Sequence, residues 1–290
     1  MLQANLNLYK FNYAENGNGD TLVLVHGSAS DYRTWDKQLL EFGMYYHTIA
    51  YSRRFHWPNK QISDAEDYSM IQHVEDLEEF IKFIGNNKTV HLIGHSYGAF
   101  LCLLLALKNS KLIRTLTLAE PPAVTLYVSN VPKPLEILKL LLTNPKLALA
   151  IIKFGTKGIT PATKALNQND LNLALDVFGK ATLGVQSYLN LSEERRKQAK
   201  TNLIKAELLG SGLLPLSKNK IKKLNLPTLL ISGQNSPKLF QYLLFEINKL
   251  IPNSELKIIP DASHIMHEDN SSYYNATVLS FLKKHGEMYK

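Results

Sequence analysis

Cysteine is nearly absent from this chain, whose 290 residues include only Cys102. A single cysteine excludes an internal disulfide and a cysteine-based metal cluster, and its place in an apolar stretch predicts a buried thiol. No basic segment followed by an apolar run stands at the N-terminus. We therefore expect no signal peptide and a cytoplasmic protein.

Long uncharged runs are also scarce. The longest stretch without Asp, Glu, Lys or Arg covers 89–107, and glycines interrupt it. This interruption favours a buried core segment over a membrane span.

Acidic residues are fewer than basic ones, and the imbalance is local. Segment 121–225 contains sixteen Lys or Arg and six Asp or Glu, a net charge of +10 in a chain whose total is +8. Because the positive charge is confined and no aromatic–basic interleaving accompanies it, we expect no nucleic acid partner. A solvated lysine-rich helical surface is one interpretation. A weak contact with an anionic membrane surface, or steering of an acidic substrate, is the other.

The hydrophobic patterns predict strands that alternate with helices. Expected strands cover 6–13, 21–25, 46–51, 89–93, 113–118, 228–232 and 255–259, and expected helices cover 32–42, 68–84, 99–107, 238–250 and 271–285. Segment 121–225 shows helical patterns only, at 135–142, 147–154, 162–178 and 193–209. We predict an α/β core domain formed by 1–120 and 226–290, interrupted by a helical cap domain at 121–225.

The most informative motif is Gly94-His95-Ser96-Tyr97-Gly98, which fits G-x-S-x-G. An apolar strand pattern precedes it and an apolar helix pattern follows it, as in the nucleophile elbow of hydrolases. Larger side chains in place of the two glycines would collide with the neighbouring strand and helix. The N-terminus of the helix also directs free N–H groups toward any negative charge that develops at Ser96.

With this elbow, the His26-Gly27 turn and the helical insertion in place, the chain resembles the α/β-hydrolase superfamily. The similarity is greatest to its cap-bearing branch of epoxide hydrolases and haloalkane dehalogenases, although serine stands at the nucleophile position. The resemblance implies a mostly parallel eight-stranded sheet with a cap between strands six and seven. It also implies the catalytic order serine, acid, histidine, with Ser96 as the nucleophile. His264, in the loop after the last strand, would be the base, with His267 as the local rival.

The acid of the triad departs from the commonest family pattern. The position after strand seven reads Gly233-Gln234-Asn235-Ser236, without a carboxylate. The other position used in the superfamily follows strand six, where this chain has Glu120. We therefore predict that Glu120 orients His264 and stabilises its imidazolium form. The alternative is that Gln234 or Asn235 orients His264 through a neutral hydrogen bond.

The resemblance also suggests further site residues. The backbone N–H groups of Tyr97 and Ser28 would form the oxyanion hole, and each such donor is typically worth about 3 kcal/mol of transition-state stabilisation. Trp35, Arg53 and Trp57 are candidates for substrate contact, with Arg53 pairing with a substrate carboxylate. For each of them, packing or a structural ion pair is the competing interpretation.

These residues predict a serine hydrolase that acts by acyl transfer on an ester or thioester of a small to medium apolar substrate. No metal or organic cofactor is expected. Alternatives on the same fold are carbon–carbon bond hydrolysis, a cofactor-less oxygenase or peroxidase, and a non-catalytic ligand-binding protein. The substrate and the oligomeric state are not predictable from the sequence.

Overall fold

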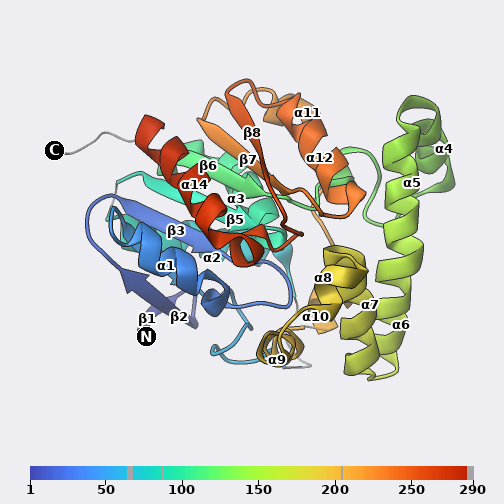
Figure 1. Ribbon diagram of the computed structural model, residues 1–290, viewed down its shortest axis with the longest axis horizontal. Helices are drawn as coiled ribbons and strands as arrows, with labels where there is room; N and C mark the ends of the chain where they lie inside the picture. Colours follow the sequence, from blue (N-terminus) through green and yellow to red (C-terminus); the bar gives the residue numbers. More distant parts are fainter. Residues whose placement is uncertain (64–67, 87, 204, 286–290) are drawn as a thin grey trace.

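Eight strands form one sheet in the order β1-β2-β4-β3-β5-β6-β7-β8 (Figure 1). The computed structural model describes residues 1–63, 68–86, 88–203 and 205–285. The strands are β1 (Leu2–Leu6), β2 (Tyr9–Asn16), β3 (Thr21–Val25), β4 (His47–Tyr51), β5 (Val90–His95), β6 (Ile113–Ala119), β7 (Thr228–Gly233) and β8 (Ser254–Ile259). Strands β3 to β8 are mutually parallel, whereas β1 and β2 pair in antiparallel fashion. The chain thus has the expected mostly parallel sheet of an α/β hydrolase.

The N-terminal edge of the sheet differs from the sequence prediction. A single strand was expected over 6–13, but the chain turns back at Asn7 and Leu8, whose φ angles are +48° and +58°. The turn joins β1 and β2 into a hairpin. The alternating pattern continues through this turn, so periodicity alone does not reveal it.

Helices cover both faces of the sheet, as parallel strands require. They are α1 (Asp36–Phe42), α2 (Met70–Gly85), α3 (Tyr97–Asn109), α12 (Lys238–Asn248), α13 (Met266–Asp269) and α14 (Ser271–His285). In β3, Val23 and Val25 pack with α2 and α3, whereas Leu22 and Leu24 pack with α1 and α14. Both faces of the central strands are therefore buried, which fixes the ends of the strands where the site lies.

The segment between β6 and β7 is helical. It contains α4 (Pro134–Thr143), α5 (Pro145–Phe154), α6 (Thr160–Asn167), α7 (Leu171–Leu183), α8 (Val185–Leu189), α9 (Glu193–Thr201), α10 (Lys205–Leu209) and α11 (Lys218–Ile221). The helix expected over 162–178 is divided, because the Asp170 side chain caps α7 by accepting a hydrogen bond from the Leu173 N–H. Helix α11 lies beside α12 (Figure 1), and Ile221 packs into the core beneath the sheet, so the chain rejoins the body before residue 225.

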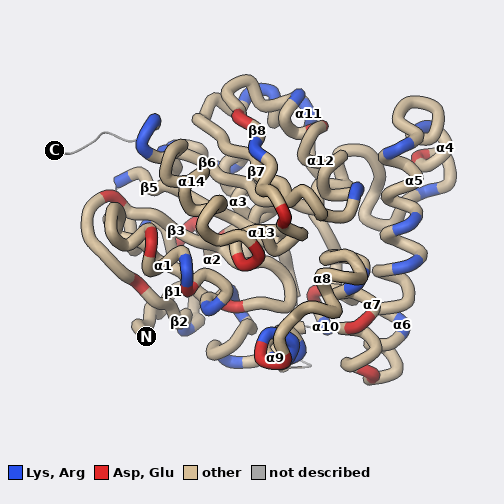
Figure 2. Tube along the Cα trace, in the orientation of Figure 1, with Lys and Arg blue, Asp and Glu red and all other residues tan. Residues whose placement is uncertain are grey.

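The outer side of this helical segment is basic and partly apolar. Figure 2 shows lysines along α5 and α6 with few acidic residues near them. Leu135, Leu138 and Leu142 share one side of α4 and are 79, 54 and 81% exposed; we call them the α4 stripe. No helix in the described ranges has the length and apolarity to span a membrane. The membrane-surface contact expected from the charge remains a prediction.

Candidate active site

Ser96 lies at the sharp turn between β5 and α3. Its φ and ψ angles are +50° and −119°, a conformation that is strained for a residue with a side chain. A Cβ on Gly94 would lie 2.6 Å from the Ala99 Cα, and a Cβ on Gly98 would collide with the carbonyl oxygens of Val25 and His26. The glycines therefore permit the close approach of strand and helix that holds Ser96 at the tip of the turn.

Glu120 and His264 come together from distant parts of the chain. Glu120 follows β6 directly, and His264 lies in the loop between β8 and α13. The Nδ1 atom of His264 is 2.5 Å from Oε2 of Glu120, and both side chains are buried. The other carboxylate oxygen, Oε1, accepts hydrogen bonds from the Ser232 hydroxyl at 2.5 Å and from the Gly233 N–H at 3.1 Å. Glu120 is thus held on both sides, in the position from which it can orient the imidazole.

Burial sets the protonation of this pair. Removal from water raises the pKa of Glu120 to about 8, although the hydrogen bonds to its carboxylate oppose the rise. Removal from water also lowers the pKa of His264 to about 3. Between these values the pair is neutral and carries two protons. Loss of one proton leaves Glu120 ionised and frees Nε2 of His264 to act as a base.

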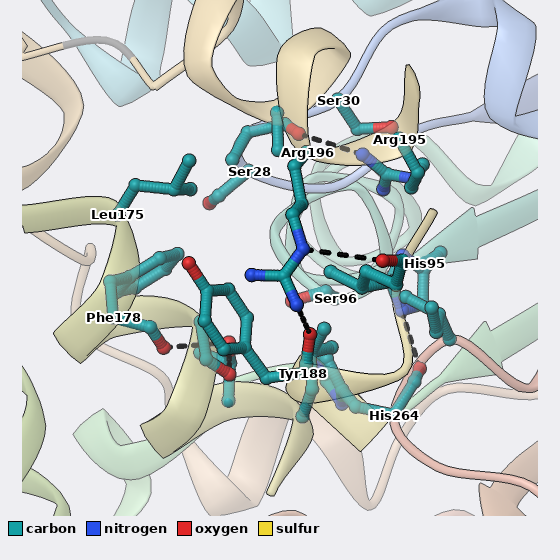
Figure 3. A pocket seen from close by; sticks show the side chains of 17 residues that line it. Ser28, Ser30, His95, Ser96, Leu175, Phe178, Tyr188, Arg195, Arg196 and His264 are labelled. Atoms are coloured by element: carbon teal, nitrogen blue, oxygen red, sulfur yellow. Dashed lines mark hydrogen bonds between the residues drawn. The ribbon is translucent and has the colours of Figure 1, made fainter. Parts of the chain in front are cut away.

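Ser96 and His264 line one cavity beneath the helical segment (Figure 3). Its volume is about 60 Å³, and Ser28 also lines it. The Nε2 atom of His264 is buried and has no hydrogen-bond partner among the described residues. Tyr97 is the first residue of α3, so its N–H has no acceptor within the helix. Ser96, the Nε2 atom of His264 and the candidate oxyanion donor Ser28 thus belong to one small site, and Tyr97 follows Ser96 directly in the chain.

The alternative orienting residues lie elsewhere. The Gln234 side chain accepts a hydrogen bond from the Asp261 N–H, and the backbone N–H of Asn235 donates to the Ala262 carbonyl. Neither amide is bonded to His264, whose Nδ1 faces Glu120. His267, the local rival, is buried with its Nε2 atom 2.9 Å from the Thr34 hydroxyl and is not among the residues that line the cavity.

The three candidates for substrate contact are not among the residues that line this cavity. Trp35 is fully buried and packs against His267, with ring centroids 4.4 Å apart. Trp57 stacks on Tyr32 and under the Arg33 guanidinium. The structure thus corrects these two assignments, because both indoles are engaged in packing.

Arg53 is likewise occupied, which corrects its assignment to a substrate carboxylate. Its Nη2 atom is 2.9 Å from Oε1 of Glu207 in α10, and both side chains are buried. The same guanidinium donates to the carbonyls of His26 and Gly27 and lies over the Tyr97 ring, 4.6 Å from its centroid. Arg53 therefore ties the helical segment to the body beneath the elbow, as the competing interpretation of a structural ion pair anticipated.

Sequence reasoning missed several residues that shape the site. Phe240 of α12 stacks on the His264 ring, with centroids 4.0 Å apart, and Ser232 supports Glu120. Arg196 and Tyr188, from the helical segment, line the cavity with Ser96. No motif marks these positions, because each acts through a contact between distant segments. No group of three His, Cys, Asp or Glu side chains suited to a metal ion was found in the described residues.

Comparison with known proteins identifies the class to which this fold and site belong. The family model described as "alpha/beta hydrolase fold" matches residues 20–271. The chain therefore belongs to the alpha/beta hydrolase family, and most of the relatives found are named as hydrolases. We accordingly describe the protein as a hydrolase.

Individual relatives are similar over most of the chain. Epoxide hydrolase 3 of Xenopus tropicalis is 25% identical over 288 residues, which cover 95% of this chain and 75% of the relative. A putative 2-succinyl-6-hydroxy-2,4-cyclohexadiene-1-carboxylate synthase of Bacillus subtilis is 24% identical, covering 91% of this chain and 90% of the relative. The structure of an esterase from Thermogutta terrifontis superposes with a TM-score of 0.75 at 19% identity, covering 96% of this chain and 94% of the esterase. This last similarity shows the fold.

Proposed function

We propose that this hydrolase is a serine enzyme that cleaves an ester or thioester by acyl transfer. The observation that carries the proposal is the convergence of Ser96 and His264 on one cavity, with Glu120 2.5 Å behind the imidazole. This is the arrangement of nucleophile, base and orienting acid that activates a serine hydroxyl.

The reaction would proceed in two halves. Oγ of Ser96 attacks the carbonyl carbon while Nε2 of His264 takes the hydroxyl proton, and Glu120 stabilises the imidazolium that forms. The oxyanion of the tetrahedral intermediate receives hydrogen bonds from the N–H groups of Tyr97 and Ser28. Collapse breaks the bond to the alcohol or thiol, which leaves with the proton from Nε2.

Water completes the second half. It enters the cavity, loses a proton to Nε2 of His264 and attacks the carbonyl carbon of the acyl group on Ser96. The second tetrahedral intermediate collapses with return of the proton to the serine oxygen, releasing the carboxylic acid and regenerating the free enzyme.

Epoxide opening is a weaker interpretation, although several relatives carry that name. A covalent route of that kind requires a carboxylate nucleophile, and the elbow of this chain carries Ser96. The carboxylate nearest to the base, Glu120, is bonded to Nδ1 and is turned away from the cavity that Ser96 lines.

A fluorophosphonate probe followed by peptide mass spectrometry tests the proposal. We expect the wild-type protein to be labelled at Ser96, Ser96→Ala to remain unlabelled, and Glu120→Gln to be labelled far more slowly. A series of 4-nitrophenyl esters of increasing chain length then gives kcat/KM for the same three proteins. Folded wild-type protein that is neither labelled nor active on any ester would contradict acyl transfer and favour a ligand-binding role.

A further inference from the structure

The six arginines of the chain fall into two groups. Five of them form an ion pair with a carboxylate, namely Arg33 with Asp31, Arg53 with Glu207, Arg54 with Asp76, Arg114 with Asp20 and Arg195 with Glu268. For the sixth, Arg196 of α9, no ion pair exists within the described part of the chain. Arg195 and Arg196 both line the cavity that contains Ser96, and Arg195 is the one already paired with a carboxylate.

Neutral groups hold the Arg196 guanidinium in place. Its Nη2 atom donates to the carbonyls of Tyr188 and Leu189 at 2.8 and 2.9 Å, and its Nε atom donates to the Leu191 carbonyl at 3.2 Å. Its Cζ atom lies 4.7 Å from the centroid of the Tyr188 ring. These contacts fix the orientation of the guanidinium, and no carboxylate of the described residues forms an ion pair with it.

The position of this charge relative to the reaction centre is the second observation. Figure 3 shows the Arg196 side chain extending into the cavity among Ser28, Ser96 and Tyr188. None of the lining residues that the structure describes is acidic, and apolar side chains form much of the wall, with Leu175, Phe178, Leu183, Leu191 and Ile265. A guanidinium held beside a largely apolar wall can donate charge-assisted hydrogen bonds to an anion that enters the cavity, and such bonds are stronger than those between neutral groups.

We propose that Arg196 binds a carboxylate on the substrate, so that the preferred substrates of Ser96 are short esters or thioesters that carry a free carboxylate. Nε and Nη2 of Arg196 already donate to backbone carbonyls, so its Nη1 group is the donor available for a charge-assisted hydrogen bond to a carboxylate. The apolar wall accommodates the carbon chain between the carboxylate and the scissile carbonyl. This inference rests on the proposed acyl transfer at Ser96 and specifies the substrate for that site.

A pair of esters that differ in one charge tests the inference. The anionic probe is mono-4-nitrophenyl glutarate, and the neutral probe is 4-nitrophenyl methyl glutarate, with spontaneous hydrolysis subtracted from both. We expect wild-type protein to prefer the anionic probe. In Arg196→Gln, we expect kcat/KM for the anionic probe to fall by about 10- to 100-fold, mainly through KM, because a charge-assisted hydrogen bond is lost. The neutral probe should change by less than about threefold, within the range of an ordinary surface substitution.

Two further variants separate charge recognition from other effects. Lys197→Gln removes one positive charge from the adjacent, exposed position of the same helix and is the matched control; it should leave both probes unchanged. Arg196→Lys keeps the charge without the planar fork and should recover part of the preference. Equal losses on both probes in Arg196→Gln and Arg196→Lys would assign Arg196 a structural role and overturn the inference.

Failure of the proposed function is distinguishable from failure of this inference. Turnover that depends on Ser96 but shows no preference for the anionic probe refutes the inference and leaves acyl transfer standing. Absence of Ser96-dependent turnover of both probes refutes acyl transfer on these esters. Calorimetric titration with glutarate then decides the inference by itself. A dissociation constant at least tenfold higher in Arg196→Gln than in Lys197→Gln supports a carboxylate site. Equal binding, or none, overturns it.

Discussion

The pH dependence of Ser96 reactivity is the sharpest test of the Glu120–His264 pair. Burial raises the pKa of Glu120 to about 8 and lowers that of His264 to about 3. While Glu120 is protonated it donates to Nδ1, so the imidazole proton resides on Nε2 and the base is blocked. Activity therefore requires the loss of one proton and increases with pH. For a single proton with a pKa of about 8, the reactive fraction is about one tenth at pH 7 and about one hundredth at pH 6.

Glu120→Gln removes this titration. His264 then has a neutral partner and, with its pKa lowered by burial to about 3, stays unprotonated between pH 5 and 9. We expect the labelling rate of Ser96 to become independent of pH over this range. The labelling rate of the variant should lie about 10³- to 10⁴-fold below the plateau that the wild-type rate reaches at high pH, because a neutral amide cannot stabilise the imidazolium. The ratio of wild-type to variant rates should consequently grow about tenfold from pH 6 to 7 and about fivefold from pH 7 to 8.

The measurement is the second-order rate of fluorophosphonate labelling between pH 5 and 9. Ser232→Ala removes a hydrogen bond at 2.5 Å from the Glu120 carboxylate, so the pKa should rise further and the transition should move to higher pH. Glu246→Gln, which alters a carboxylate bonded to Tyr127 away from the cavity, is the control and should follow the wild-type curve. A transition near pH 8 that persists in Glu120→Gln would refute the reasoning, since it would belong to another group.

Three further predictions concern the surroundings of the site. Phe240→Ala removes the ring stacked on His264 and should lower the free energy of unfolding by about 3–5 kcal/mol, as measured by urea denaturation. Glu207→Gln leaves the buried charge of Arg53 unpaired and should lower the free energy of unfolding by about 3 kcal/mol; an unchanged urea midpoint would show that the backbone carbonyls suffice for that charge. Replacing the three leucines of the α4 stripe with glutamine should weaken co-sedimentation with vesicles that contain phosphatidylserine. If the wild-type protein sedimented equally with phosphatidylserine vesicles and with purely zwitterionic vesicles, a contact based on charge would be contradicted.

The elements that position Ser96 were predictable because their signals are local. The pentapeptide around Ser96 lies between two apolar runs, and burial on both faces of a parallel sheet enforces such runs. Glu120 was predicted as the partner of His264 because the superfamily that the chain resembles uses an acid directly after strand six, with Gln234 or Asn235 as the alternative. The hairpin at Asn7 was missed, since its turn depends on backbone angles that the alternating pattern does not encode.

The helical segment was predicted as helical, but its contacts were not. The boundaries within 162–178 and 193–209 depend on capping at Asp170 and on packing against the body, both of which override the continuous helical pattern. The stacking of Phe240 on His264 joins helix α12 to the loop after β8. Such contacts leave no periodicity or motif in a single sequence.

The arginines show most clearly why a sequence alone does not reveal which charged residue can bind a substrate. From the sequence, Arg53 was the candidate for a substrate carboxylate, and nothing singled out Arg196. What distinguishes them is whether a carboxylate of the protein already lies against the guanidinium. Glu207 lies against Arg53 from 154 residues away, whereas the bonds to Arg196 come from the carbonyls of Tyr188, Leu189 and Leu191 nearby in the chain. A charge that is paired within the protein is occupied, whereas a charge held by neutral groups beside Ser96 remains available to a ligand. The partner of each arginine, rather than its position in a motif, therefore decides which of the two can select the substrate.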